Sequence, residues 1–216
     1  MTREETKEFL ERAALIPVLR APSMELGHAL VDAMMAGGIT VIEVTMTVPN
    51  AIKLLRELKH RHGKKLLLGS GTVIDAAQAE ATIEAGAEFV VSPSLHLDVI
   101  AKTKELGKVS IPGALTPTEV ITAWRAGADY VKIFPCSAMG GASYLKALRA
   151  PFPDVKLIPT GGVTFQTAVD FLRAGASALG VGADLVNPKA IAEGKPEIIT
   201  ETARAYLEII KAARSA

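Results

Sequence analysis

The chain has 216 residues, of which 49% are hydrophobic and 22% charged, and its formal net charge is +1 at pH 7. This composition predicts a globular protein with one sizeable core, and the scattered Lys and Arg residues exclude the basic patch of a nucleic-acid-binding protein. No apolar run reaches membrane-spanning length, the N-terminus is too charged for a secretory signal, and the single cysteine, Cys136, excludes an internal disulfide. We therefore expect a cytoplasmic protein with no membrane partner, folded as a single domain over residues 1–216.

A helical pattern that ends at glycine and leads into an apolar run recurs along the chain. Ala-Gly pairs end four of these patterns, and Gly63 and Gly107 take the same place in two more. Glycine just past a helix end adopts the left-handed conformation without steric cost. Successive caps lie roughly 20–26 residues apart, which leaves room for one helix and one strand.

In chain order, the pattern predicts eight strands: Leu15–Arg20, Val41–Met46, Lys65–Gly69, Phe89–Ser92, Val109–Pro112, Tyr130–Phe134, Lys156–Pro159 and Ala178–Val181. Helices are expected at Thr2–Ala13, Met24–Ala36, Asn50–His62, Ala76–Ala85, Leu97–Leu106, Pro117–Ala126, Gly141–Arg149, Phe165–Ala174 and Glu197–Ala213. This alternation requires parallel pairing and favours an α/β fold, a (β/α)8 TIM barrel with an extra N-terminal helix. A doubly wound open sheet is the alternative, but no strand is followed by the Gly-rich dinucleotide fingerprint.

Lys132 lies in the middle of an apolar predicted strand, YVKIF. Lysine is rarely buried, because removing its ammonium from water costs several kcal/mol. One explanation is structural: the side chain reaches a strand end or pairs with a carboxylate. The other is chemical, since burial disfavours the charged form and leaves a neutral amine that attacks carbonyls.

Glu43 has the same burial problem in the predicted strand VIEVTM. The two residues could neutralise each other as a structural ion pair, although such a pair rarely outperforms apolar packing. An amine and a carboxylate in one closed site also supply a covalent nucleophile and a proton shuttle, and this interpretation is favoured.

Further polar and glycine positions follow the predicted strands, at the end where barrels carry their chemistry. Thr160, Gly161 and Gly162 follow the seventh strand and Gly182 the eighth, where barrel enzymes commonly bind phosphate; two ordinary tight turns are the alternative. Arg20 closes the first strand, as a carboxylate-binding donor or as a surface residue. Thr72 follows the third strand and offers a hydroxyl group.

These residues together resemble the family of 2-keto-3-deoxy-6-phosphogluconate and 4-hydroxy-2-oxoglutarate aldolases. The matching segments are PVLR, AGGITVIEVTMTVP, GSGTV, EAGAEFVVSP, KIFP, KALRAPFPDVKLIPTGGV and GVGADLV, which span nearly the whole chain. The resemblance implies a class I aldolase barrel without metal or cofactor, usually a homotrimer, that acts on small keto-deoxy sugar acids.

The resemblance also implies roles for individual residues. Lys132 aligns with the Schiff-base lysine and Glu43 with the general acid/base. At the pyruvate end we expect Arg20, Thr72, Pro93, Phe134 and Thr160, and at the phosphate end Gly161, Gly162, Gly182 and Ala183.

The sequence departs from the family pattern at two positions. Thr47 stands where some members have the arginine that binds the pyruvate carboxylate, so Arg20 is expected to replace it. Ala183 stands where many have a phosphate-binding serine. Thr160 favours the gluconate-type substrate over the galactonate-type relative.

The expected reaction cleaves 2-keto-3-deoxy-6-phosphogluconate to pyruvate and glyceraldehyde 3-phosphate, and 4-hydroxy-2-oxoglutarate is a second candidate substrate. Three alternatives stay open: a 2-keto-3-deoxy-6-phosphogalactonate aldolase, a phosphosugar isomerase or epimerase, and a non-catalytic assembly or ligand-binding barrel. An isomerase or epimerase would not need a mid-strand lysine, and a non-catalytic barrel would form no covalent adduct with pyruvate.

Overall fold

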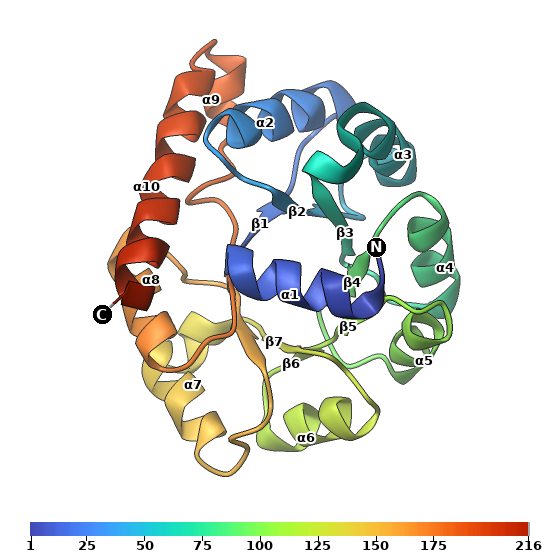
Figure 1. Cartoon of the computed structure of the whole chain (residues 1–216), viewed down its shortest axis with the longest axis vertical. Helices are drawn as coiled ribbons and strands as arrows, with labels where there is room; N and C mark the ends of the chain where they lie inside the picture. The colour runs from blue at the N-terminus through green and yellow to red at the C-terminus, as the bar shows by residue number, and fades with distance from the viewer. Residues whose placement is uncertain (216) are drawn as a thin grey trace.

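The computed structural model describes residues 1–215, in which helices and short parallel strands alternate (Figure 1). The strands are β1 (Leu15–Leu19), β2 (Val41–Thr45), β3 (Leu67–Gly71), β4 (Phe89–Val91), β5 (Val109–Ile111), β6 (Gly113–Ala114), β7 (Val131–Ile133), β8 (Leu157–Pro159) and β9 (Leu179–Val181). The helices are α1 (Arg3–Ala13), α2 (Met24–Ala36), α3 (Ala51–His62), α4 (Ala76–Glu84), α5 (Leu97–Glu105), α6 (Pro117–Arg125), α7 (Ala142–Arg149), α8 (Phe165–Arg173), α9 (Pro188–Ala192) and α10 (Pro196–Ser215), with 3₁₀ turns η1 (Gly63–Lys65) and η2 (Cys136–Met139). None of the helices in this described part is long and apolar enough to cross a membrane.

The strands form two parallel sheets, with the helices arranged around them in Figure 1. One sheet has six strands in the order β5-β4-β3-β2-β1-β9 and the other has the order β6-β7-β8. A single bridge, Thr160 to Gly180, links the two at the β8–β9 side. The predicted parallel α/β fold is therefore confirmed, whereas the hydrogen-bonded ladders do not make one continuous eight-stranded sheet.

Proline explains where the ladders are interrupted. The sequence predicts one strand over Val109–Pro112, but Pro112 has no N–H to extend a ladder, and the structure has β5 and β6 on either side of it. Pro159 likewise ends β8, at the side where a single bridge leads to β9. Both prolines are buried, so their neighbours pack without extending the ladder.

The third strand differs from its expected boundaries. The sequence predicts that it ends at Gly69, yet β3 runs on to Gly71 because Ser70 and Gly71 pair with Val44 and Thr45 of β2. The Ser70 hydroxyl also contacts the Thr82 hydroxyl of α4 at 2.9 Å. Pairing between distant segments thus overrides the weak strand preference of glycine.

Alternation along the strands separates two layers of apolar side chains. One cluster lies in the interior of the curled sheet and comprises Leu10, Ile16, Val41, Leu67, Phe89, Val91, Val109, Ile111, Tyr130, Ile158 and Ala178. The intervening residues face the helices and join a larger outer cluster. Leu10 belongs to α1, so this helix contributes to the interior from one end of the strands.

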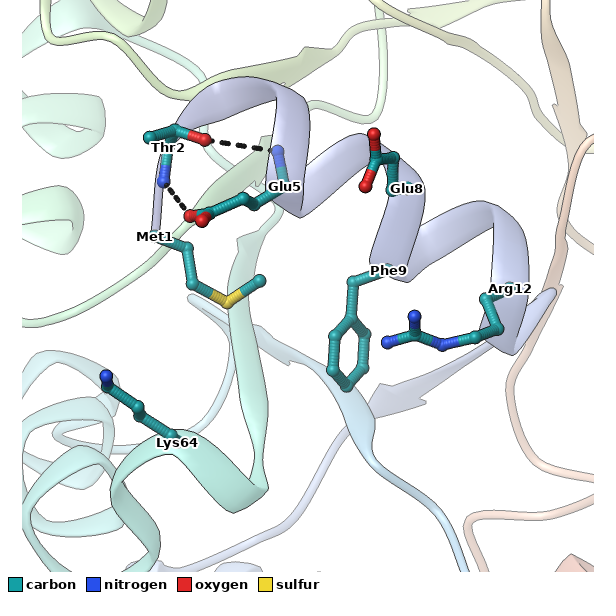
Figure 2. Close-up of a pocket in the computed structure, with 7 residues that line it drawn as sticks. All are labelled: Met1, Thr2, Glu5, Glu8, Phe9, Arg12 and Lys64. Atoms are coloured by element: carbon teal, nitrogen blue, oxygen red, sulfur yellow. Dashed lines mark hydrogen bonds between the residues drawn. The ribbon is translucent and has the colours of Figure 1, made fainter.

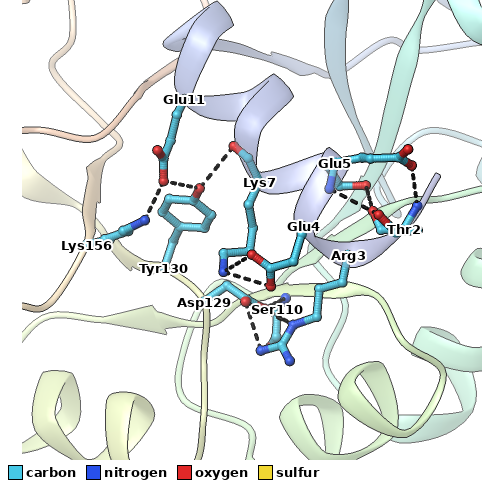
Figure 3. Close-up of polar contacts among 11 residues, drawn as sticks. Thr2, Arg3, Glu4, Glu5, Lys7, Glu11, Ser110, Asp129, Tyr130 and Lys156 are labelled. Atoms are coloured by element: carbon cyan, nitrogen blue, oxygen red, sulfur yellow. Dashed lines mark hydrogen bonds and ion pairs between the residues drawn. The ribbon is translucent and has the colours of Figure 1, made fainter.

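Polar contacts bind α1 across the N-terminal ends of the strands (Figure 3). Arg3 forms an ion pair with Asp129 at 2.8 Å, and the Asp129 carboxylate accepts the backbone N–H of Ser110. Tyr130 donates its hydroxyl to Glu11 at 2.8 Å, and Lys156 donates to the same carboxylate. Because α1 closes this end, the strands' C-terminal ends are the accessible side.

Candidate active site

Lys132 and Glu43 meet inside the curled sheet although they come from different sheets. Lys132 on β7 pairs in register with Gly113 and Ile158, and Glu43 on β2 pairs with Val18 and Gly69. Their side chains are only 6% and 4% exposed, and Lys132 Nζ lies 3.9 Å from Glu43 Oε1. The structure thus brings together the two charged residues that the sequence singled out.

The Glu43 carboxylate lies against a glycine and keeps one oxygen free. Oε1 is buried and accepts no hydrogen bond from the residues that the structure describes, 1–215. A Cβ added to Gly71 would lie 1.9 Å from this oxygen, so a side chain at residue 71 would displace the carboxylate. Gly71 was not among the predicted site residues. It lies in the GSGT segment, where a glycine in a strand often marks a position at which another group approaches the backbone closely.

A cavity of about 300 Å³ opens at the C-terminal ends of the strands, and neither Lys132 nor Glu43 lines it. It is lined by Val18, Arg20, Phe134, Thr160, Gly161, Gly162, Val163, Thr164, Gly180, Gly182, Ala183 and Asp184. Phe134 lines the cavity and also lies near the pair, since Lys132 Nζ is 5.2 Å from the centroid of its ring. We call this cavity the rim pocket.

The loop after β8 gives the rim pocket a backbone suited to anions. Gly161 and Gly162 have φ values of 87° and 77°, which are left-handed, and a Cβ on Gly162 would lie 2.2 Å from the Cβ of Ser137. Thr164 precedes the first turn of α8 and also lines the pocket. A glycine loop that opens a helix presents backbone N–H groups to a negative ligand.

The predicted site residues divide into groups in the structure. Arg20, Phe134, Thr160, Gly161, Gly162, Gly182 and Ala183 all line the rim pocket. Arg20 is exposed, and it lines the same cavity as the glycine loops after β8 and β9. Thr72 and Pro93 do not line this pocket, and Thr72 has φ of 60°, an uncommon conformation for a β-branched residue.

Five pocket residues were not predicted as site residues: Val18, Val163, Thr164, Gly180 and Asp184. Gly180 belongs to the GVG segment, and a Cβ there would lie 2.2 Å from Thr160 Oγ1, so its role is to give that hydroxyl room. Thr164 follows the predicted glycine loop directly. Asp184 carried no sequence signal, because a single acidic residue in a loop is typical of any protein surface.

Other candidate features lie apart from this site. A pocket of about 730 Å³ lies between α1 and η1, at the closed end of the strands (Figure 2). Burial raises the pKa of the Cys136 thiol to about 11, which makes it a poor nucleophile, and its buried position fits packing. Within residues 1–215, no three His, Cys, Asp or Glu side chains are grouped so that they could hold a metal ion.

Comparison with known proteins gives a consistent result. Residues 6–202 match the family model described as KDPG and KHG aldolase, where KDPG is 2-keto-3-deoxy-6-phosphogluconate and KHG is 4-hydroxy-2-oxoglutarate. The 2-dehydro-3-deoxy-6-phosphogalactonate aldolase of Escherichia coli (strain K12) is 32% identical over 205 residues, which cover 94% of this chain and 100% of that protein.

Two solved structures also superimpose closely on this chain. The first is a KDPG aldolase from Legionella pneumophila with pyruvate captured as a covalent carbinolamine. It has a TM-score of 0.86 and 32% identity, covering 93% of this chain and 97% of that one. The second is a cage designed by fusing symmetric oligomeric domains, with a TM-score of 0.84 and 31% identity, covering 93% and 73%. The chain therefore belongs to the KDPG and KHG aldolase family and is a carbon–carbon lyase.

Proposed function

We propose that the protein cleaves 2-keto-3-deoxy-6-phosphogluconate to pyruvate and glyceraldehyde 3-phosphate through a Schiff base on Lys132. The observation that carries this proposal is the pairing of a buried lysine with a buried, incompletely bonded carboxylate at 3.9 Å. Stability alone is a weak reason to keep such a pair. The Legionella relative, with pyruvate captured as a covalent carbinolamine, supports the same chemistry here.

In the proposed reaction, Lys132 attacks the C2 ketone as a neutral amine. A carbinolamine forms, and loss of water gives a protonated imine that withdraws electrons from C3. The Phe134 ring, 5.2 Å from Nζ, covers one side of the amine and limits its contact with water.

Glu43 is proposed to move the protons. Through a water molecule, it takes the proton of the C4 hydroxyl as the C3–C4 bond breaks, which releases the aldehyde and leaves an enamine. It then returns that proton to C3, and hydrolysis of the resulting imine frees pyruvate and Lys132. The free Oε1 atom beside Gly71 is the oxygen available for these transfers.

The rim pocket is proposed to bind the rest of the substrate. Gly161, Gly162, Gly182 and Ala183 form its phosphate end, through backbone N–H groups and the start of α8. Arg20 is proposed to bind the pyruvate carboxylate with Thr72, Pro93, Phe134 and Thr160 at the same end. The left-handed backbone of Thr72 supports this role, because strain in a β-branched residue is common at binding sites.

Several broader features belong to the same proposal. The two sheets would act as one eight-unit barrel, since β5 continues into β6 and the Thr160–Gly180 bridge joins β8 to β9. Residues 1–216 would form one cytoplasmic barrel domain, and three copies would associate as a homotrimer, needing no metal or cofactor. The match to a protomer of a cage built from symmetric oligomeric domains supports self-association.

Two further substrates are compatible with the family. The first is 4-hydroxy-2-oxoglutarate, which shares the pyruvyl end and lacks the phosphate. The second is 2-keto-3-deoxy-6-phosphogalactonate, because the Escherichia coli enzyme of that name is 32% identical to this chain. Comparing kcat/KM for the three substrates decides among them.

The central test is trapping of pyruvate on Lys132. We expect borohydride reduction in the presence of pyruvate to add one reduced pyruvyl group per chain, which peptide mass spectrometry should place on Lys132. Lys132→Arg should abolish both the adduct and the activity. An adduct on another lysine, or none on the folded protein, would contradict the proposal.

A second test separates the two ends of the substrate. Arg20→Ala should lower kcat/KM for phosphorylated substrates and for 4-hydroxy-2-oxoglutarate alike, about 10- to 100-fold, because both carry the pyruvyl carboxylate. Gly162→Val should penalise only the phosphorylated substrates, since a Cβ there would lie 2.2 Å from Ser137 Cβ and displace the glycine loop of the phosphate end. If Arg20→Ala affects only phosphorylated substrates, Arg20 belongs to the phosphate end instead.

A further inference from the structure

One residue outside the rim pocket contacts two segments beside its phosphate end, the loop after β9 and the first residue of α8. Tyr206 lies on α10 and is completely buried. Its hydroxyl donates a hydrogen bond to Asp184 Oδ2, in the loop after β9. Its ring stacks on Phe165, with centroids 4.3 Å apart and planes inclined by 25°. Phe165 is the first residue of α8 and follows Thr164, which lines the pocket.

The helix that carries Tyr206 is itself firmly packed. Its buried residues, Ile199, Ala203, Tyr206 and Ile210, follow a helical spacing and form one face. Through this face α10 packs against α2, α8 and α9 (Figure 1). Tyr206 therefore projects from a packed helix onto the loop after β9 and the start of α8.

Asp184 is an unexpected residue in a pocket for phosphate. A phosphate monoester carries about −1.5 to −2 charges near pH 7, and a carboxylate in the same cavity repels it. Arg20 supplies one positive side chain to this pocket. A hydrogen bond from Tyr206 stabilises the negative charge on Asp184 Oδ2 and limits where the carboxylate can point. Burial, together with this hydrogen bond, raises the pKa of Tyr206, so the phenol stays a neutral donor.

We propose that Tyr206 is a positioning residue for the phosphate end of the substrate, acting by holding the Asp184 carboxylate toward α10 and fixing the start of α8. This inference rests on the proposed function. Asp184 is then the specificity-determining residue, because its charge penalises phosphate whenever it is released into the pocket.

The decisive variant is Tyr206→Phe, which keeps the ring on Phe165 and removes the hydroxyl from Asp184. We expect KM for 2-keto-3-deoxy-6-phosphogluconate to rise about three- to tenfold, the size of one screened charge–charge interaction at a partly exposed site. The kcat for this substrate should change less than twofold. Both constants should stay within twofold for 4-hydroxy-2-oxoglutarate, which has no phosphate.

Asp184→Asn supplies the rescue. It keeps the shape of the side chain and its bond from Tyr206 but removes the charge, so KM for the phosphorylated substrate should be equal to or lower than that of the wild type. In this background, Tyr206→Phe should change that KM by less than twofold, because no charge is left to position. A Tyr206 effect of equal size in both backgrounds would overturn the proposed route through Asp184.

Tyr130→Phe is the matched control. Tyr130 is also fully buried and also donates its hydroxyl to a carboxylate, that of Glu11, but at the closed end of the strands. The Tyr130→Phe variant should lose comparable thermal stability without changing the ratio of the KM values for the two substrates.

Equal KM changes for both substrates in Tyr206→Phe, or none, would show a structural role only. A wild-type protein that cleaves no phosphorylated substrate would remove the proposed function itself, and this inference with it.

Discussion

At the scale of single residues, the Lys132–Glu43 pair is expensive to keep for stability alone. Both side chains are almost completely buried, and removing two charges from water generally offsets most of their mutual attraction. Their separation of 3.9 Å is also longer than a direct hydrogen bond. The two side chains therefore make no direct hydrogen bond, and Glu43 Oε1 keeps its capacity to accept a proton.

Glu43→Gln should therefore reduce activity much more than stability. We expect kcat to fall by about 10²- to 10⁴-fold, the usual contribution of general acid–base catalysis, while Lys132 still traps pyruvate slowly. Steady-state kinetics, borohydride trapping and a thermal melt of the same sample give the three readouts. Near-normal turnover would contradict the catalytic role, and an unfolded variant would favour a structural ion pair.

Gly71→Ala is a companion to this variant, because it leaves the carboxylate present but displaces it. The added methyl would lie 1.9 Å from Glu43 Oε1, so the carboxylate must move by more than its hydrogen-bonding tolerance. We expect a smaller loss of kcat than in Glu43→Gln. In the Glu43→Gln background, Gly71→Ala should cause little further loss of kcat, since no catalytic carboxylate remains to misplace.

At the scale of elements, α1 seals the end of the strands opposite the site. Its N-terminus carries a capping box between Thr2 and Glu5, and its polar face binds Asp129, Tyr130 and Lys156 (Figure 3). Tyr130 directly precedes β7 and belongs to the interior cluster, and Lys132, two residues later, lies in the middle of that strand. Fastening α1 to Tyr130 therefore also steadies the strand that carries the lysine.

Tyr130→Phe should lower the free energy of unfolding by about 1.5–2 kcal/mol, the lower part of the range for one hydrogen bond to a charged group, because the Glu11 side chain is 42% exposed. Urea denaturation measures this difference.

Burial alone would raise the pKa of Glu11, but hydrogen bonds from Lys156 and Tyr130 outweigh it and lower that pKa below its ordinary value.

The sign of the pH dependence follows from this shift. A carboxylate whose pKa is lowered by folding stabilises the protein above its unfolded pKa of about 4.3, and this stabilisation is lost as pH falls through the folded value. Glu11→Gln should reduce stability at pH 7 and flatten the loss of stability below about pH 4.5. An unchanged acid-unfolding profile would show that Glu11 contributes nothing to closing this end.

At the scale of the whole molecule, the proposed homotrimer has a direct test. Light scattering coupled to size-exclusion chromatography should give a mass three times that of the 22.7 kDa chain, independent of concentration over the micromolar range. A monomer or dimer under these conditions would contradict that part of the proposal. The pyruvate adduct would then still report on the site within one chain.

The sequence by itself determined the parallel α/β fold, the order of its helices and strands, and the candidate catalytic residues. Helix caps, apolar periodicity and glycine positions are local signals, because they reflect backbone conformation and burial within one element. Lys132 and Glu43 were conspicuous for the same reason: each is a charge within an apolar strand.

Only the tertiary structure decided which of these residues meet. Glu43 and Lys132 are about 90 residues apart in sequence and lie in different sheets, so their approach depends on how the two sheets curl around one interior. The grouping of Arg20 with both glycine loops, and the reach of Tyr206 to Asp184, follow from the curling of the sheet and the packing of α10. No local pattern encodes such contacts, because they arise where distant elements close on one another.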